Sequence, residues 1–344
     1  MSSNRILISG NEAVGEGAIK AGCRFYAGYP ITPQNELTAY MARRLPEVGG
    51  VFIQAESELA AINMVLGASA AGARAMTTSS SPGISLMQEA ISYMAGMELP
   101  AVIVNIMRGG PGLGNIAGAQ GDYFQATKGG GHGDYRLIVL APSCVQEMAD
   151  FTQKAFYLAF KYKNPVMVLA DGYLGQMMEP AEIKEFNFED DSLSWRLDGA
   201  EGREPRLFRS LYLPVEDLEG LNIRLQKKYR EMRREESWRE YYTEDAEELL
   251  VAYGTCARVC REVVRLGRKE GRKWGLFQPI TLWPYPERRL KELGRKVSKV
   301  LVVEMSAGQM VEDVRRILGE EKVGFYGRMG GALPVKEEIW KKLI

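Results

Sequence analysis

The feature that most constrains the fold is a series of short, continuously apolar runs separated by stretches with helical spacing. In the first 180 residues these runs are Ile6–Ser9, Arg24–Gly28, Val51–Gln54, Ala73–Thr78, Ala101–Met107, Leu137–Leu140 and Val166–Ala170. A strand is apolar along its whole length when both faces of its sheet are covered, as in parallel sheets flanked by helices. The pattern therefore predicts a doubly wound α/β domain with a mostly parallel sheet.

The same pattern returns near the C-terminus, where Leu249–Gly254, Trp274–Trp283 and Val300–Met305 read as strands with helices between them. Between the two regions the chain is polar and charged. Its run Leu221–Glu240 is rich in helix formers and mixed charge, which fits either a solvated connecting helix or a surface for a partner subunit. We therefore divide the chain into an α/β domain at 1–185, a charged connecting segment at 186–246 and a smaller α/β domain at 247–344.

Composition excludes several classes of protein. Lys plus Arg and Asp plus Glu are equal at 44 each, and the N-terminal half has no basic stripe, which disfavours a nucleic-acid partner. No apolar run reaches the ~18 residues of a membrane span, and the N-terminal apolar stretch is too short for a secretory signal. The four cysteines are scattered without a C-x-x-C, so the chain encodes no iron–sulfur or zinc motif. We expect a reduced, cytoplasmic protein.

Four short segments fall at predicted strand-to-helix turns or in Gly-rich loops beside them. They are GYPITP (Gly28–Pro33), QAESELAA (Gln54–Ala61), RGGPGLG (Arg108–Gly114) and GGGHGD (Gly129–Asp134). Open α/β sheets bind ligands outside the carboxyl ends of their strands. The segments supply Thr32, Glu58, Arg108 and His132, which indicates a site for a small anionic substrate with one acid/base group.

Glu58 and Arg108 each have two explanations. A carboxyl group between a helix N-terminus, which favours its ionised form, and apolar neighbours, which favour its neutral form, is suited to exchanging a proton near neutral pH. The alternative explanation is that Glu56 and Glu58 only place negative charge at a helix N-terminus, a common arrangement without a catalytic role. Arg108 ends a strand, where its guanidinium can hold a carboxylate through two parallel hydrogen bonds or serve as a surface charge.

Thr32 and His132 are equally open on local grounds. Thr32 precedes Pro33, a residue suited to the first turn of a helix, so Thr32 is expected as the helix N-cap, with a ligand-facing hydroxyl as the alternative. His132 is the only histidine, so a multi-histidine metal site is excluded. It either bonds to loop backbone or faces the substrate.

Taken together, the motifs resemble the α subunit of the 2-oxoacid:ferredoxin oxidoreductases. The resemblance rests on GYPITP, Ser57-Glu58 and RGGP in the first half, and on VAYGT (Val251–Thr255), PITLWPYP (Pro279–Pro286) and VEMSAGQM (Val303–Met310) in the second. These thiamine diphosphate (TPP) enzymes convert a 2-oxoacid and coenzyme A into an acyl-CoA, CO2 and reduced ferredoxin. The resemblance implies a pyrimidine-binding domain of the TPP-enzyme type followed by a domain like the transketolase C-terminal domain.

The resemblance also implies roles for individual residues. Glu58 matches the glutamate that hydrogen-bonds N1′ of the cofactor's aminopyrimidine and so promotes loss of the C2 proton. Pro30 and Ile31 fall in the motif that contacts the cofactor. Thr32 and Arg108 match positions that meet the substrate carboxylate, and His132 is a further candidate for substrate contact.

Two absences predict partner subunits. The family binds the cofactor diphosphate and Mg2+ through a G-D-G…N motif, whereas this chain offers only Ala170-Asp171-Gly172, at a different place. It also lacks cluster cysteines. The resemblance therefore implies half an active site and no metal site in this chain. A β subunit supplies the diphosphate and Mg2+ half, with a γ subunit and a ferredoxin-like subunit carrying the iron–sulfur clusters; ferredoxin and coenzyme A are further partners.

The substrate prediction rests on the loop after Arg108, which looks most like the branched-chain and 2-oxoglutarate members. No Lys or Arg stands between Arg108 and Lys128, and a second buried carboxylate would need a second cation. We therefore favour 2-oxoisovalerate over 2-oxoglutarate or pyruvate, unless Lys128 or the β subunit supplies that cation. A TPP decarboxylase without ferredoxin chemistry and a non-catalytic assembly or regulatory paralogue stay open as alternatives.

Overall fold

A computed structural model describes residues 5–188 and 193–343. The first α/β region contains strands β1 (Ile6–Ser9), β2 (Phe25–Gly28), β3 (Val51–Gln54), β4 (Ala75–Ser79), β5 (Ala101–Met107), β6 (Ile138–Leu140), β7 (Pro165–Asp171) and β8 (Met178–Ala181). Its helices are α1 (Gly10–Lys20), α2 (Asn35–Glu47), α3 (Glu58–Ala70), α4 (Pro82–Gly96), α5 (Tyr123–Lys128), α6 (Val145–Tyr162) and α7 (Gly172–Gln176). Each predicted strand is present, displaced by at most two residues at an end.

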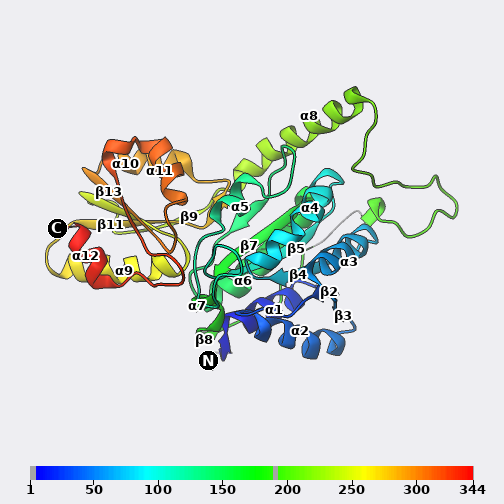
Figure 1. The fold of residues 1–344 in the computed structure, drawn as a ribbon, viewed down its shortest axis with the longest axis horizontal. Coiled ribbons are helices and arrows are strands. Elements are labelled where there is room, and N and C mark those ends of the chain that lie inside the picture. Colours follow the sequence, from blue (N-terminus) through cyan, green and yellow to red (C-terminus); the bar gives the residue numbers. More distant parts are fainter. Residues whose placement is uncertain (1–4, 189–192, 344) are drawn as a thin grey trace.

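The main sheet has seven strands in the order β12-β6-β7-β5-β4-β2-β3. Every pairing is parallel except that of β12 (Thr281–Trp283), a strand from the C-terminal region that lies antiparallel to β6. Helices α3 and α4 cover one face and α1, α2 and α6 the other (Figure 1). The predicted doubly wound α/β fold is confirmed, although β1 lies outside this sheet, in an antiparallel pair with β8.

Burial on both faces explains the continuous apolar runs. All seven residues of β5 and all seven of β7 are buried. Full burial of a Val, Leu or Ile side chain is worth about 1.5–3 kcal/mol relative to exposure, so these two central strands anchor the domain. The polar Asn105 and Asp171 are exceptions near their carboxyl ends, and both make the contacts described below.

The second α/β region has a five-stranded sheet in the order β14-β13-β10-β11-β9. Its strands are β9 (Trp238–Tyr241), β10 (Glu248–Val251), β11 (Trp274–Pro279), β13 (Lys299–Glu304) and β14 (Val323–Gly327). Helices α9 (Gly254–Lys269) and α12 (Lys336–Leu343) lie on one face, and α10 (Glu287–Gly294) and α11 (Met310–Leu318) on the other (Figure 1). Short 3-10 turns occupy Leu193–Trp195, Arg233–Glu235 (η2) and Glu320–Lys322.

Two details of the sequence-based prediction need correction. The run Trp274–Trp283 is not one strand, because Ile280 separates β11, in the smaller sheet, from β12, in the larger one. The charged segment contributes β9 to the smaller sheet, antiparallel to β11. The domain limits at 185 and 246 stay a prediction.

The helix expected at Leu221–Glu240 is α8 (Val215–Met232), which begins earlier and ends sooner. Leu221, Leu225, Tyr229 and Met232 are buried, and their spacing of three to four residues places them on one face. The opposite face is charged, so α8 is an amphipathic helix packed along the molecule rather than a fully solvated connector. Figure 1 shows it running along one edge of the structure.

The two α/β regions are joined by buried polar contacts at the carboxyl ends of β5 and β7. Asp171 accepts hydrogen bonds from Thr255 Oγ1 (2.7 Å) and from the backbone N–H groups of Tyr173 (3.1 Å) and Leu174 (3.2 Å). Gln120 bonds to the backbone of Tyr253 and Met305 through its side chain, at 3.0 Å each. Asp171 thus caps α7 and fixes α9, which explains why the sequence Ala170-Asp171-Gly172 is not a diphosphate motif.

We predict that Asp171→Ala lowers the free energy of unfolding by about 3 kcal/mol, because it leaves the Thr255 hydroxyl and three backbone N–H groups without an acceptor. Asp171→Asn keeps one side-chain oxygen and should cost less. Urea denaturation of the purified chain measures both effects. Asp134→Ala, which removes an exposed carboxylate, is the control; an equal loss there would contradict the explanation.

Candidate active site

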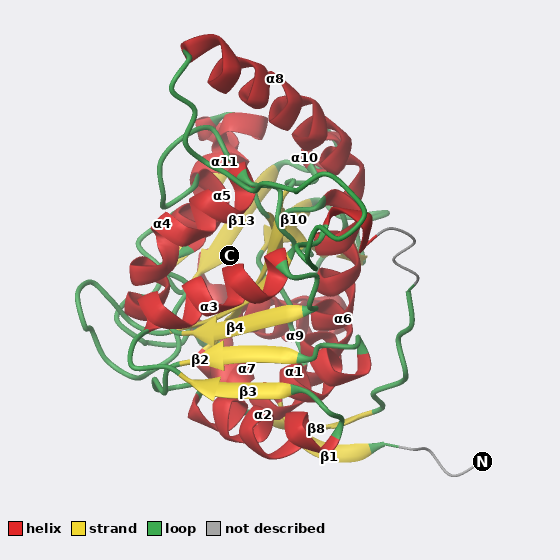
Figure 2. Cartoon of the chain, turned by 90° about the vertical axis from the view of Figure 1, so that its right-hand side faces the viewer, coloured by secondary structure: helices red, strands yellow, loops and turns green. Residues whose placement is uncertain are grey.

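Neighbouring parallel strands place the predicted site segments along one edge of the main sheet. The order β5-β4-β2-β3 puts Arg108, the Ser79–Ser81 run, the GYPITP turn and Glu58 at successive strand ends. Figure 2 shows β4, β2 and β3 running side by side. Three of the four segments singled out from the sequence therefore meet at this edge, as the parallel topology requires.

Glu58 is the first residue of α3 and is buried, with 6% of its surface exposed. Ser57 caps the helix by accepting a hydrogen bond from the Ala60 N–H (3.1 Å), so the Glu58 side chain is not used for capping. A Cβ atom at position 83 would lie 2.5 Å from Glu58 Oε1 and 2.1 Å from Ser79 Oγ. Only glycine allows the carboxylate and this hydroxyl to approach the start of α4 so closely.

Several polar groups around Glu58 have no partner within the chain. Among the residues that the structure describes, none donates a hydrogen bond to the Glu58 carboxylate. The hydroxyl groups of Ser79 and Ser80 at the end of β4 are also buried without a partner. Because buried polar groups are almost always hydrogen-bonded, this cluster fits a ligand that supplies the missing donor and acceptors.

Thr32 does not cap α2 as expected. The helix begins at Asn35 with Gln34 as its N-cap residue, and Ile31 O accepts a hydrogen bond from Gln34 N (3.0 Å) to form a turn. The Thr32 hydroxyl accepts a bond from the Asn35 side chain (3.2 Å) instead. Pro30 is exposed and Ile31 half-buried, so both flank Thr32 at the surface of the turn.

Arg108 connects the GYPITP turn to the glycine-rich loop. Its Nη1 donates to the backbone carbonyl of Thr32 (3.0 Å) and its Nη2 to that of Leu113 (2.9 Å). Its Nε–H is buried without a partner. Because a guanidinium has five donors, Arg108 holds the two segments together and still has donors left for an anion.

The structure reveals a hydrogen-bonded hub that the sequence-based analysis missed. Ser81 N donates to Asn105 Oδ1 (3.0 Å), Ser81 Oγ donates to Asp122 Oδ2 (2.6 Å), and Asn105 Nδ2 donates to the same oxygen (2.9 Å). Arg108 N donates to Ser81 Oγ (3.0 Å). Burial raises the pKa of Asp122, while the bonds from Ser81 and Asn105 act in the opposite direction.

Ser81 has a φ of +27°, which a residue with a side chain rarely adopts. The hub holds it there, directly before α4 and two residues before Gly83, so it couples Arg108 to the Glu58 cluster. The sequence contained a signal: Asn105 interrupts an otherwise apolar strand, and a run of Thr and Ser ends β4. Neither feature showed which residues Asn105 and the serines would hydrogen-bond.

His132 is not brought into this group. It is exposed, and its carbonyl accepts a hydrogen bond from Ser92 Oγ (2.9 Å) on the third turn of α4. Gly83, beside Glu58, lies in the first turn of the same helix. At 1.5 Å per residue the two positions are about 13 Å apart along the axis, so the loop explanation describes His132 better than a contact with the Glu58 cluster.

The described part of the chain offers little to other classes of site. No three His, Cys, Asp or Glu side chains gather there in a way that could hold a metal ion. The four cysteines are free, and burial raises the pKa of the Cys23 thiol to about 12. None of the described helices combines the length and the apolarity that a membrane span requires.

Sequence comparison assigns both halves of the chain. Residues 16–237 match the thiamine diphosphate-binding family of pyruvate flavodoxin/ferredoxin oxidoreductases, and residues 246–339 match core domain II of pyruvate:ferredoxin oxidoreductase. Ketoisovalerate oxidoreductase subunit VorB of Methanothermobacter thermautotrophicus is 51% identical over 339 residues, which cover 98% of this chain and 96% of that protein. The 2-oxoglutarate synthase subunit KorA of Archaeoglobus fulgidus is 42% identical, covering 90% and 91%.

Solved structures agree with these matches. A 2-oxoglutarate:ferredoxin oxidoreductase from Magnetococcus marinus, with 2-oxoglutarate, coenzyme A and succinyl-CoA bound, superposes with a TM-score of 0.89 at 29% identity. The match covers 99% of this chain but only 65% of that longer chain. A split-gene transketolase shares the fold with a TM-score of 0.60 at 14% identity, covering 97% and 96%. The expected pair of domains, pyrimidine-binding and transketolase C-terminal-like, is thereby confirmed.

We predict that Asp122→Ala lowers the free energy of unfolding by about 1–3 kcal/mol, since it leaves the Ser81 hydroxyl and the Asn105 amide without an acceptor. Asp122→Asn retains an oxygen for both bonds and should be much milder. Because the folded-state pKa of Asp122 is raised, the folded chain holds this proton to higher pH than the unfolded chain. The stability of the wild type relative to Asp122→Asn should therefore be greatest at acidic pH and fall as pH rises from the ordinary carboxyl range through the raised pKa.

Urea denaturation of the wild type and of Asp122→Asn across that pH range measures the difference in their free energies of unfolding. A difference that grows with pH would contradict the assignment.

Proposed function

The chain belongs to the 2-oxoacid:ferredoxin oxidoreductases, as a thiamine diphosphate-binding subunit of a multisubunit oxidoreductase, and on this premise we propose that it carries the pyrimidine and substrate-carboxylate half of the active site. The observation that carries this proposal is the buried Glu58 carboxylate, which has no donor within the described chain. When bound, TPP supplies the electron sink for decarboxylation of the 2-oxoacid.

Glu58 is proposed to accept or share a proton with the pyrimidine ring of the cofactor. Its position at the N-terminus of α3 favours a negative charge, and with 6% of the residue exposed little water can compete for the carboxylate. Ser79 Oγ lies beside it as a further polar contact. Pro30 and Ile31, on the adjacent turn, are proposed to flank the cofactor.

Arg108 and Thr32 are proposed to bind the carboxylate of the 2-oxoacid. Two of the Arg108 donors are occupied by the carbonyls of Thr32 and Leu113, which fixes the guanidinium plane before substrate arrives. The buried Nε–H has no partner within the chain and is available to an anion. His132 keeps a proposed role only if a partner subunit brings substrate to its loop.

The remainder of the active site is proposed to come from other subunits. A β subunit would hold the diphosphate and Mg2+, and γ and cluster-bearing subunits would complete electron transfer to ferredoxin. In support, four large apolar side chains lie 72–85% exposed near the start of α8, at Leu207, Leu211, Leu213 and Val215. These four residues fall within one stretch of nine, and exposed apolar side chains of this kind are typical of interaction surfaces. A cytoplasmic location is part of this proposal, in keeping with four free cysteines.

The proposed substrate is a branched-chain 2-oxoacid such as 2-oxoisovalerate, converted with coenzyme A to an acyl-CoA. Leu113 and Ile116, in the loop after Arg108, are exposed and offer apolar surface. Lys128 is not free to bind a second substrate carboxylate, because its Nζ lies 2.6 and 2.8 Å from the two oxygens of Asp313. The similarity to the ketoisovalerate subunit supports the same choice.

We predict that Glu58→Gln in the assembled enzyme lowers 2-oxoacid-dependent ferredoxin reduction by about 10²–10⁴-fold, the usual contribution of a positioned proton-transfer group. Exchange of the C2 proton of bound TPP, followed by NMR, should slow in parallel. Glu56→Gln alters an exposed carboxylate two residues earlier and should leave both rates unchanged. Wild-type exchange in Glu58→Gln would remove this residue from the mechanism.

We also predict that kcat/KM for 2-oxoisovalerate exceeds that for 2-oxoglutarate. Apolar walls stabilise an aliphatic side chain by about 0.8 kcal/mol per buried CH2, whereas a second carboxylate without a cation is penalised. Steady-state assays of the assembled enzyme with both acids decide the question. A preference for 2-oxoglutarate would show that a partner subunit supplies the missing cation.

A further inference from the structure

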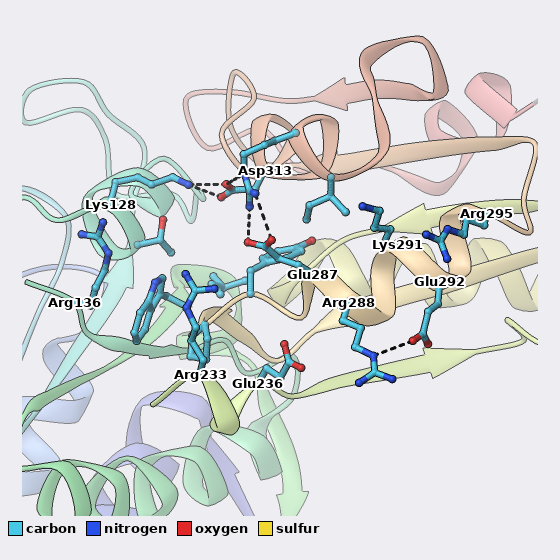
Figure 3. Close-up of a pocket in the computed structure, with 17 residues that line it drawn as sticks. Lys128, Arg136, Arg233, Glu236, Glu287, Arg288, Lys291, Glu292, Arg295 and Asp313 are labelled. Carbon is cyan, nitrogen blue, oxygen red and sulfur yellow. Dashed lines mark hydrogen bonds and ion pairs between the residues drawn. The ribbon is translucent and has the colours of Figure 1, made fainter. Parts of the chain in front are cut away.

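A large cavity in the described part of the chain lies away from Glu58, between the two α/β regions. Its volume is about 820 Å3, within the ordinary range for small-molecule sites. One wall comes from the end of α5 and the loop that follows it, another from η2, and the rest from α10, α11 and the segment Leu282–Tyr285. Figure 3 shows Lys128, Arg136 and Arg233 on one side and Lys291 and Arg295 on the other.

Positively charged side chains outnumber carboxylates around this cavity. Seven Lys or Arg side chains line it, against four carboxylates. Three of those carboxylates already have cationic partners: Asp313 with Lys128 (2.6 Å), Glu287 with Arg316 (2.5 Å) and Glu292 with Arg288 (3.2 Å). The wall therefore keeps a net excess of three positive charges.

Four of the cations lining the cavity have no ion pair among the described residues. They are Arg136, Arg233, Lys291 and Arg295. The fourth carboxylate, Glu236, is half-buried between Arg233 and Arg288, the two cations whose fields act on it. Cations from separate elements that converge on one cavity without an ion pair are arranged as they would be for a multiply charged anion.

Aromatic and hydroxyl groups add a second, independent indication of a ligand. Trp283 and Tyr285 both line the cavity. The Tyr285 hydroxyl is buried without any hydrogen-bond partner, and only 8% of the residue is exposed. A buried orphan hydroxyl calls for a polar partner, and an indole ring offers a stacking surface to any nucleobase.

We propose that this cavity binds a nucleoside di- or triphosphate group, with its phosphates held by Arg136, Arg233, Lys291 and Arg295 and its base against Trp283. A terminal phosphate carries about −1.5 to −2 charge near pH 7, so two or three phosphates balance the excess of three positive charges. The residues that bind it come from both α/β regions, so the ligand cross-links them. Free nucleotides and coenzyme A both contain this chemistry.

The cavity is distinct from the proposed active site. Asp122, at the start of α5, belongs to the hub beside Arg108, whereas Lys128, at its end, lines the cavity. Six helical residues separate these groups by about 9 Å. Substitutions on α10 therefore change the cavity without touching the Glu58 cluster.

Calorimetric titration of the assembled enzyme with ADP, coenzyme A and inorganic pyrophosphate tests the proposal. We expect saturable ADP binding that Lys291→Glu weakens by at least about 10-fold, as loss of a charge-assisted contact implies. Lys296→Glu reverses a neighbouring exposed charge that does not line the cavity, and should leave ADP affinity unchanged. Basal 2-oxoacid oxidation should be unaffected in Lys296→Glu.

The same titrations identify the source of the group. Equal affinity for ADP and coenzyme A, both lost in Lys291→Glu, indicates a free nucleotide, whereas coenzyme A bound more than 10-fold tighter through Lys291 indicates that cofactor. The proposal is overturned if no nucleotide binds the assembled enzyme. It is also overturned if the two charge reversals weaken binding equally, since the effect would then be one of net charge rather than of the cavity.

Discussion

The shape of the candidate site depends on Ser81 being held in a backbone conformation that it would not adopt alone. Its φ of +27° is stabilised by the amide of Asn105 and the carboxylate of Asp122, and its hydroxyl in turn accepts the Arg108 N–H. These residues lie at the ends of β4 and β5 and the start of α5. A strained residue in such a position persists only because its surroundings over-determine it. The hub thereby sets the start of α4, where Gly83 leaves space for Glu58, and the first residue of the glycine-rich loop.

The second α/β region determines the path of the rest of that loop. Gln120 is bonded to Met305 and Tyr253, and Asn115 donates to Gly330 O (2.6 Å). A glycine-rich segment loses much conformational entropy on ordering, and these contacts from a separate region offset that cost. The C-terminal region therefore stabilises the loop on the proposed substrate side of the site.

The polar groups that lack partners lie where ligands would be expected. The Ser79 hydroxyl and the Arg108 Nε–H are buried without partners at one edge of the main sheet, near the largely buried Glu58, and the Tyr285 hydroxyl is buried without a partner at the cavity between the regions. An unpaired buried group destabilises the folded chain by about 1–3 kcal/mol. A chain that keeps several of them has its stability coupled to what it binds, which agrees with a subunit that contributes half of a shared site.

The sequence by itself determined the fold class and the edge of the sheet at which chemistry gathers. A continuous apolar run indicates a strand that is buried on both faces, and this can be inferred from the residues of that strand alone. Given parallel strands, the placement of Thr32, Glu58 and Arg108 at neighbouring strand ends follows from topology. Predictions from local sequence patterns were wrong, or left alternatives open, where the structure depends on residues far away in the chain. Gln34, not Thr32, is the N-cap residue of α2; Ile280 divides one apolar run between two sheets; and His132 lies with Ser92, away from Glu58.

Only the tertiary structure decided the polar contacts, because their partners are far apart in sequence. Ser81 is 24 residues from Asn105 and 41 from Asp122, and Lys128 is 185 from Asp313. Hydrogen bonds and ion pairs need atoms within about 3 Å, a condition that no periodicity along the chain encodes. The hydrophobic pattern thus specified which residues are inside, and the folded arrangement specified which of them meet.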